Sequence, residues 1–149
     1  MMATSRSLLV SRYLVASALG ASFGCVACAS DNPSDRTFAQ QVEAGGELYG
    51  VRCAECHGDS GQGTADAPRL VGDGALPKEP PAEREVRTNE FGTAADVFAF
   101  VDEYMPATAP DSVSRAEKVD ILAFALSANG VELDAPLTLE NAADVVLHE

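Results

Sequence analysis

Apolar residues recur three or four positions apart in several segments of the chain, which is the spacing of one helix face. In the first segment, residues 38–56, that face carries Val42, Gly45, Gly46, Tyr49, Cys53 and Cys56. The segments 93–104 and 114–129 begin at Thr93 and Ser114, residue types that cap helix N-termini. We therefore predict three helices over these ranges, and a weaker fourth helix over 139–147.

Two adjacent glycines, Gly45 and Gly46, lie within the first predicted helix. Glycine destabilises a helix interior, so its presence there calls for a packing reason. We expect another helix to cross closely at this point.

The segment 58–87 shows no sustained period and is rich in glycine and proline. A bare loop of this length is unusual in a small domain, so we expect it to wrap around something. No segment alternates with a period of two, which predicts little or no sheet and an all-α fold.

The N-terminal residues have the order of a secretory signal: Arg6 and Arg12, then the apolar run 13–23, then small residues ending in Ala27-Cys28-Ala29. We predict a signal peptide over 1–29, a polar linker over 30–38 and a domain over 39–149. The expected location is extracytoplasmic, in the periplasm or on the outer face of a bacterial membrane.

Cys25 and Cys28 resemble the cysteine that accepts the lipid at the end of a bacterial lipoprotein signal. Lipid anchoring and simple cleavage after Ala29 therefore stay as two alternatives. With the lipid, the polar linker would tether the domain to a membrane.

Composition narrows the function classes. The chain has 149 residues, 46% of them hydrophobic, and a formal net charge of −13. Such a composition is that of a globular protein, neither disordered nor a polytopic membrane protein. The acidic balance and the absence of tryptophan exclude nucleic acid as an expected partner. A protein partner should instead present a basic face.

The segment Cys53-Ala54-Glu55-Cys56-His57 has the C-x-x-C-H spacing that attaches c-type haem. Two thiols three residues apart on a helix end face the same way and can both bond one porphyrin edge. His57 lies on the same face and can reach the iron. A thioredoxin-type redox pair, a zinc site and a plain disulfide are the competing interpretations of the two cysteines.

Met105 is the only methionine that remains once residues 1–29 are removed, and it lies on a turn before Pro106. A thioether suits low-spin haem iron and raises its reduction potential. We therefore expect Met105 to be the distal iron ligand. His148, Lys78 and a vacant position are the alternatives.

From about Val42 to Asn129 the chain resembles the class I c-type cytochromes, which carry one haem. The matching features of the two terminal helices and the loops are Gly45, Tyr49, Ile121, Ala123, Phe124, Pro68, Leu70 and the pair Met105-Pro106. The resemblance implies a small helical domain wrapped around one covalently bound haem c. It also implies that the Pro68 carbonyl accepts a hydrogen bond from the imidazole of His57, with Leu70 in the same haem-binding loop.

Such a domain is expected to carry single electrons and not to be an enzyme by itself. The alternatives are a haem enzyme or gas-binding protein with an open distal site, and a fixed subunit of a larger oxidoreductase complex. The C-terminal extension 131–149 is expected either to cover part of the core or to dock on a partner.

Overall fold

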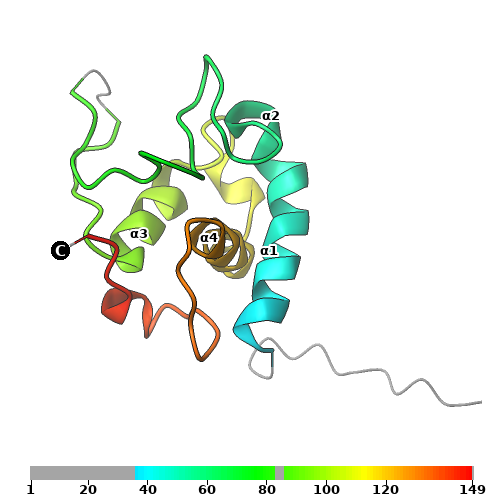
Figure 1. Ribbon diagram of the computed structural model, residues 1–149. Helices are drawn as coiled ribbons and strands as arrows, with labels where there is room; N and C mark the ends of the chain where they lie inside the picture. The colour runs from blue at the N-terminus through cyan, green and yellow to red at the C-terminus, as the bar shows by residue number, and fades with distance from the viewer. Residues whose placement is uncertain (1–35, 83–85, 149) are drawn as a thin grey trace, which may run out of the picture. The chain divides into compact units, whose positions relative to one another are not determined.

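Four α-helices form within the residues that the computed structural model describes, 36–82 and 86–148. They are α1 (Phe38–Arg52), α2 (Ala54–His57), α3 (Ala94–Tyr104) and α4 (Arg115–Ala128), as Figure 1 shows. Two 3-10 turns, η2 (Pro110–Ser112) and η3 (Ala142–Asp144), complete the regular structure of this part of the chain. The expected signal peptide 1–29, with Cys25 and Cys28, and most of the linker 30–38 lie outside the described residues.

The fold class is all-α, as predicted. In the described part of the chain, the strand-like pairing amounts to one antiparallel bridge between Thr93 and Val146. The long segment between α2 and α3 contains no helix or strand where it is described. None of the described helices is long and apolar enough to cross a membrane.

α3 and α4 begin where the capping residues Thr93 and Ser114 predicted, and α1 begins after Thr37, a cap that we had not predicted. Thr37, Thr93 and Ser114 each accept a hydrogen bond from the N–H of the third helical residue, and the side chain of that residue accepts one from the N–H of the cap. Each reciprocal pair satisfies backbone donors that the first helical turn leaves open. The starts of α3 and α4 could therefore be read from local sequence.

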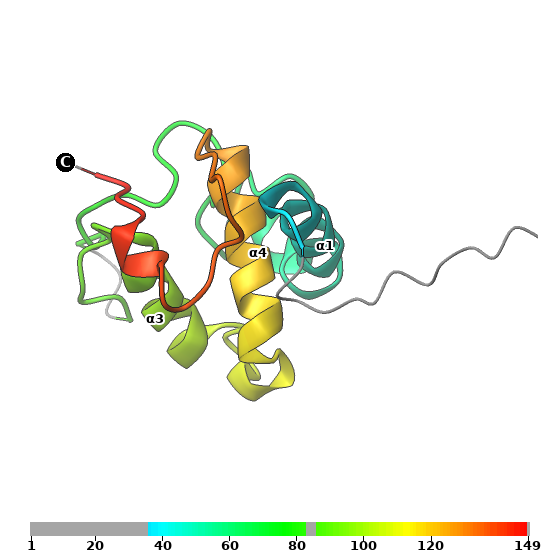
Figure 2. The ribbon, with the colours of Figure 1, turned by 90° about the horizontal axis from the view of Figure 1, so that it is seen from below.

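α1 and α4 cross in close contact, and the two glycines make that contact possible. Figures 1 and 2 show α4 running across the side of α1. A Cβ atom at Gly45 would lie 1.9 Å from the backbone oxygen of Asp120, and one at Gly46 would lie 3.2 Å from the ring of Phe124. The expected close helix crossing is thus confirmed.

The hydrophobic core lies between α4, α3 and the C-terminal extension. Its buried members come from every part of the described chain, with Ala94, Ala123 and Leu126 fully enclosed. Leu137 and Ala142, both from the extension, are also buried in this core. The extension 131–148 therefore covers the core, one of the two roles expected for it.

The side chain of Gln41 ties the extension to α1. Its Nε2 donates to the carbonyl of Leu137 at 2.9 Å, and its Oε1 accepts from the Leu137 N–H at 2.7 Å. Nε2 also donates to Asp120 Oδ1 at 3.0 Å, and Asp120 pairs with Arg36. Gln41 is 3% exposed, so these bonds are shielded from water.

Replacing Gln41 with methionine is expected to lower the free energy of unfolding by about 2–4 kcal/mol. The apolar side chain of similar length fills the space, but the buried N–H and C=O of Leu137 lose their partner. Chemical denaturation measures the loss. Gln40, exposed beside it, provides the control, because Gln40→Met removes only a capping contact and should cost at most about 1 kcal/mol. Equal losses in the two variants would contradict the expectation.

We predicted one helix over 38–56, but the first helix is not continuous to Cys56. It ends at Arg52, and Cys53 (φ −125°, ψ −31°) separates it from the short α2. The hydroxyl of Tyr49 donates to the carbonyl of Gly58 at 2.6 Å, which anchors the turn after α2 to α1. This tertiary contact accompanies the break, and no residue type in the sequence marks it.

The prediction of a fourth helix over 139–147 is wrong. Only the 3-10 turn η3 forms there, and the residues after it are extended. They pair with the segment before α3: Ala94 N–H donates to Val145 O at 2.9 Å, and Leu147 N–H donates to Gly92 O at 2.8 Å. These backbone bonds satisfy the groups that a helix would have satisfied internally.

Candidate functional site

The C-x-x-C-H segment lies where α1 gives way to α2. Backbone N–H groups of His57 and Gly58 donate to the carbonyls of Cys53 and Ala54, at 2.9 and 2.8 Å. This short helical turn leaves Cys56 exposed, Cys53 half-buried and His57 buried at 8% exposure. Both cysteines are free thiols in the structure.

The imidazole of His57 is oriented by the loop that follows α2. Its Nδ1 lies 2.7 Å from the carbonyl oxygen of Pro68. Because a carbonyl only accepts, Nδ1 carries the proton in this contact. In the neutral ring, Nε2 then has its lone pair available for a metal ion.

The loop folds back on the C-x-x-C-H segment through a small set of hydrogen bonds. The hydroxyl of Thr64 donates to Cys56 O at 2.6 Å, and Gly63 N–H donates to His57 O at 2.8 Å. Farther along, Leu70 N–H donates to Gly61 O at 2.7 Å. Leu70 itself is half-buried and packs against both hydrophobic clusters of the unit. The structure thus brings Pro68 to His57 and Leu70 to the adjoining core.

Tyr49 anchors the C-x-x-C-H segment to α1 and α4. Its side chain is 1% exposed, its hydroxyl donates to Gly58 O, and its ring lies 5.1 Å from that of Phe124 of α4. Burial raises the pKa of Tyr49 above its ordinary value of 10.0. The aromatic residue therefore links both crossing helices to the turn that ends α2.

Replacing Tyr49 with phenylalanine is expected to lower the free energy of unfolding by about 1–2 kcal/mol near neutral pH, because Gly58 O loses its donor. The difference from the native protein should shrink as the pH rises above 10. There the unfolded tyrosine ionises first, and the native state loses the advantage of its neutral hydroxyl. Denaturant titrations at several pH values measure both effects. A difference that stays constant across this range would contradict the assignment to Tyr49.

The two thiols differ in environment. Burial, and to a smaller extent the neighbouring Cys56, raises the pKa of the Cys53 thiol to about 11. A neutral, half-buried thiol is a weak nucleophile, which fits poorly with a thioredoxin-type redox pair. Within the described residues, no group of three His, Cys, Asp or Glu side chains is placed to hold a metal ion, so the zinc interpretation gains no support.

Met105 caps the C-terminus of α3 and is half-buried. Its N–H donates to Val101 O at 3.0 Å, and the backbone becomes extended at this residue. The buried Lys118 of α4 donates to Asp102 O at 2.8 Å, which holds this helix end in place. Farther along the same connection, Val113 packs with Tyr49, Ala54 and Ile121. The connection after Met105 thus reaches the cluster around the C-x-x-C-H turn at Val113.

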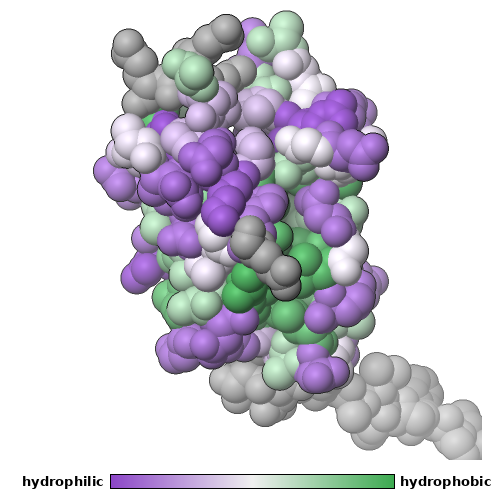
Figure 3. Space-filling view, turned by 60° about the vertical axis from the view of Figure 1, so that its left-hand side comes forward, coloured by the Kyte–Doolittle hydropathy of each residue, from purple (hydrophilic) through white to green (hydrophobic). Residues whose placement is uncertain are grey.

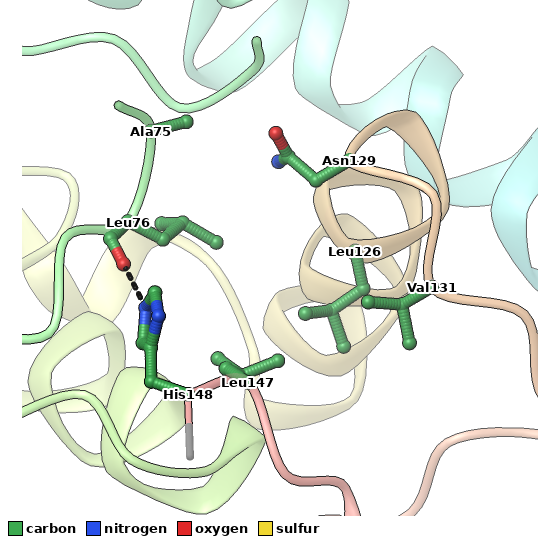
Figure 4. Close-up of a pocket in the computed structure, with 7 residues that line it drawn as sticks. All are labelled: Ala75, Leu76, Leu126, Asn129, Val131, Leu147 and His148. Atoms are coloured by element: carbon green, nitrogen blue, oxygen red, sulfur yellow. Dashed lines mark hydrogen bonds between the residues drawn. The ribbon is translucent and has the colours of Figure 1, made fainter. Parts of the chain in front are cut away.

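The alternative ligands occupy a different region. Figure 4 shows His148 at the rim of a pocket at the C-terminal end of α4, with its Nε2 2.8 Å from Leu76 O. Lys78 lies two residues beyond Leu76, and its carbonyl accepts from Phe91 N–H at 2.9 Å. His148 therefore joins the C-terminal extension to the loop, and Lys78 lies in that loop.

Several residues near the site carried no sequence signal that we used. Asn129 was read only as the end of a helix before Gly130, and Lys118 was given no role. Arg87 is 6% exposed, stacks 3.9 Å from the ring centroid of Phe91, and donates to the carbonyls of Pro77 and Glu79. All three form side-chain contacts to backbone groups distant in the sequence, which local patterns do not reveal.

Comparisons with known proteins identify a similar structure and a family. A chain of the sulfane dehydrogenase SoxCD from Paracoccus pantotrophus is 32% identical, with a TM-score of 0.53; the match covers 71% of this chain and 52% of that one. The chain thus spans about half the length of this relative. No curated protein matches it. The family model for cytochrome c oxidase, cbb3-type, subunit III matches residues 40–124, more than half of the chain. By the turn that presents two thiols beside an oriented imidazole, and by this match, the chain belongs to that family of c-type cytochromes.

Proposed function

We propose that the chain carries single electrons through one haem bound to Cys53 and Cys56, with His57 and Met105 as the iron ligands. Family membership supports electron transfer and a covalently attached haem in general terms. The observation that carries the finer proposal is the 2.7 Å contact between His57 Nδ1 and Pro68 O. It holds the ring in the tautomer whose Nε2 binds a metal.

The residues at the turn fit the group. Two free thiols stand three residues apart beside the oriented imidazole, and Met105 offers a thioether on a helix end fixed by Lys118. The haem, when bound, supplies the reversible one-electron chemistry. The chain's own residues hold the two ligands, through Pro68 O at His57 and through Lys118 at the helix end that carries Met105. Two protein ligands leave no open position for a substrate, so we propose a carrier and not an enzyme.

Optical spectra of the purified native protein, oxidised and then reduced with dithionite, test this assignment. We expect sharp c-type bands on reduction and a weak far-red sulfur-to-iron band in the oxidised form. Haem without the far-red band would overturn Met105 as ligand. A high-spin spectrum would instead favour the open-site haem enzyme or gas binder, and a chain without haem would overturn the whole proposal.

We propose that the electron partner presents a basic face. The net charge of the chain is −13, and Glu55 and Asp59, within three residues of the exposed Cys56, are also exposed. Opposite charge speeds encounter and is screened by salt. Electron-transfer rates with a cationic small-protein donor should therefore fall as ionic strength rises. A rate that is independent of salt, or that increases with it, would contradict this docking mode.

We propose an extracytoplasmic location, set by residues 1–29. Mass spectrometry of the mature protein distinguishes the two routes that the sequence leaves open. A chain that begins at Ser30 indicates simple cleavage, whereas a lipid mass on Cys28 or Cys25 indicates an anchor in the membrane. Retention of residues 1–29 in the mature protein would contradict both routes.

A second candidate is a haem domain fixed within a larger oxidoreductase. The similar chain comes from a sulfane dehydrogenase, and this chain spans 52% of it. In addition, the face in Figure 3 carries a hydrophobic area bordered by hydrophilic residues. Apolar area of this kind often marks a lasting protein interface. Co-purification of the native protein with stoichiometric partner subunits would favour this candidate over a freely diffusing carrier.

A further inference from the structure

Asn129 follows the last residue of α4, is exposed, and is hydrogen-bonded to that helix end. Its N–H donates to Leu126 O at 3.0 Å, and its side-chain Nδ2 donates to Ala125 O at 2.7 Å. Figure 4 shows the amide across from Ala75 and Leu76 of the loop after α2. The side chain therefore has a defined direction, toward that loop.

The same amide binds the loop on both its donor and its acceptor side. Nδ2 donates to Leu70 O at 2.7 Å, and Oδ1 accepts from Gly72 N–H at 3.0 Å. Both amide protons and the amide oxygen are thus used. The amide holds the backbone on both sides of Val71, as a neighbouring strand would.

This contact lies two residues from the partner of His57. The Pro68 carbonyl accepts from His57 Nδ1, and Leu70 N–H donates to Gly61 O on the opposite side of the loop. The segment after Pro68 is therefore fixed at two points. One is Gly61, next to the C-x-x-C-H turn, and the other is Asn129, on α4.

We propose that Asn129 is a positioning residue for the iron ligand His57. By holding Leu70 and Gly72 on the end of α4, it keeps the Pro68 carbonyl at hydrogen-bond distance from His57 Nδ1. This inference rests on the proposed role of His57. A hydrogen bond to the outer nitrogen of a ligating imidazole fixes the ring and increases its basicity. Asn129 therefore tunes the reduction potential without contact with the ligand.

A purely structural helix cap would stabilise α4 and leave the imidazole unaffected. The chain offers a matched control for this distinction. In the C-terminal extension, Asn141 Nδ2 donates to Pro136 O at 2.9 Å, and Asn141 Oδ1 accepts from Thr138 N–H at 2.8 Å. Asn141 thus makes the same kind of two-sided contact in a segment that does not include Pro68.

The experiment compares Asn129→Ala with Asn141→Ala in the haem-containing protein, since both changes leave the charge unaltered. NMR of the reduced form measures hydrogen exchange at His57 Nδ1, and potentiometry measures the midpoint potential. In Asn129→Ala we expect hydrogen exchange at His57 Nδ1 to be about tenfold faster, because the loop that carries Pro68 loses its hydrogen bonds to α4. We also expect a higher potential, because the imidazole becomes a weaker donor. Asn141→Ala should keep the native exchange rate and potential.

Equal exchange rates and potentials in the two alanine variants would overturn the inference. Asn129→Asp provides a second test, because a carboxylate can still accept from Gly72 N–H but cannot donate to Leu70 O. We expect it to exchange as fast as Asn129→Ala, and a native rate would also overturn the inference. Failure of the proposed function would look different: the native protein itself would lack haem or a bound imidazole.

Discussion

Replacing Gly45 with alanine is expected to disrupt the packing of α1 on α4 and to lower the free energy of unfolding by at least about 3 kcal/mol. The added Cβ would lie 1.9 Å from Asp120 O and 2.5 Å from Asp120 C. Both are backbone atoms inside a helix, so no side-chain rotation relieves the clash and the helices must separate. The gain in helix propensity, up to about 1 kcal/mol, is too small to offset this.

Gly50 is the matched control, since it lies in the same helix with nothing within 4 Å of the added Cβ. Gly50→Ala should be neutral or stabilising by up to about 1 kcal/mol. Gly46→Ala should fall between the two, because its nearest neighbour is the side chain of Phe124. Chemical denaturation of the three variants would refute the crossing geometry if Gly45→Ala were as stable as Gly50→Ala.

Replacing Met105 with leucine is expected to remove the far-red sulfur-to-iron band and to lower the midpoint potential by some hundreds of millivolts, within the roughly 0.8 V over which axial ligands set haem potentials. Leucine preserves much of the volume of the half-buried side chain and removes only the sulfur. A neutral thioether favours the reduced iron, so its loss favours the oxidised state. Spectra and potentiometry measure the two effects.

His148→Gln and Lys78→Gln are the controls for the alternative ligands. Glutamine at 148 can still donate to Leu76 O, so the local packing is kept. We expect both variants to retain the native spectrum and potential. If either one lost the native ligand signature while Met105→Leu kept it, Met105 would not be the ligand.

Features that depend on neighbouring residues were predicted well from the sequence. The caps at Thr93 and Ser114 act within one helical turn, so they are visible in a few consecutive residues. Gly45 and Gly46 stood out because glycine is unfavourable within a helix, and the crossing with α4 explains them. The C-x-x-C-H spacing likewise depends on one turn of backbone.

Features that depend on distant residues were missed. The segment 139–147 was read as a helix, but pairing of Val145 and Leu147 with Ala94 and Gly92 keeps its end extended. The amides of Gln41 and Asn129 contact backbone groups 96 and 59 residues away. Such contacts exist only once the chain has folded, and the residues next to a polar residue in a helix do not indicate them.

The crossing of α1 and α4 also bears on the order of events during biogenesis. It joins residues from opposite ends of the described chain, and Gln41 contacts Asp120 across 79 residues. Because the chain is made from its N-terminus, the cysteine pair exists well before α4 can dock. Until then Tyr49 and Ala54 lack the cover of Ile121, and Cys53 is not yet shielded by the folded domain. We infer that the cysteine pair is most accessible for cofactor attachment before α4 docks. Docking of α4 then encloses the C-x-x-C-H segment in the folded domain.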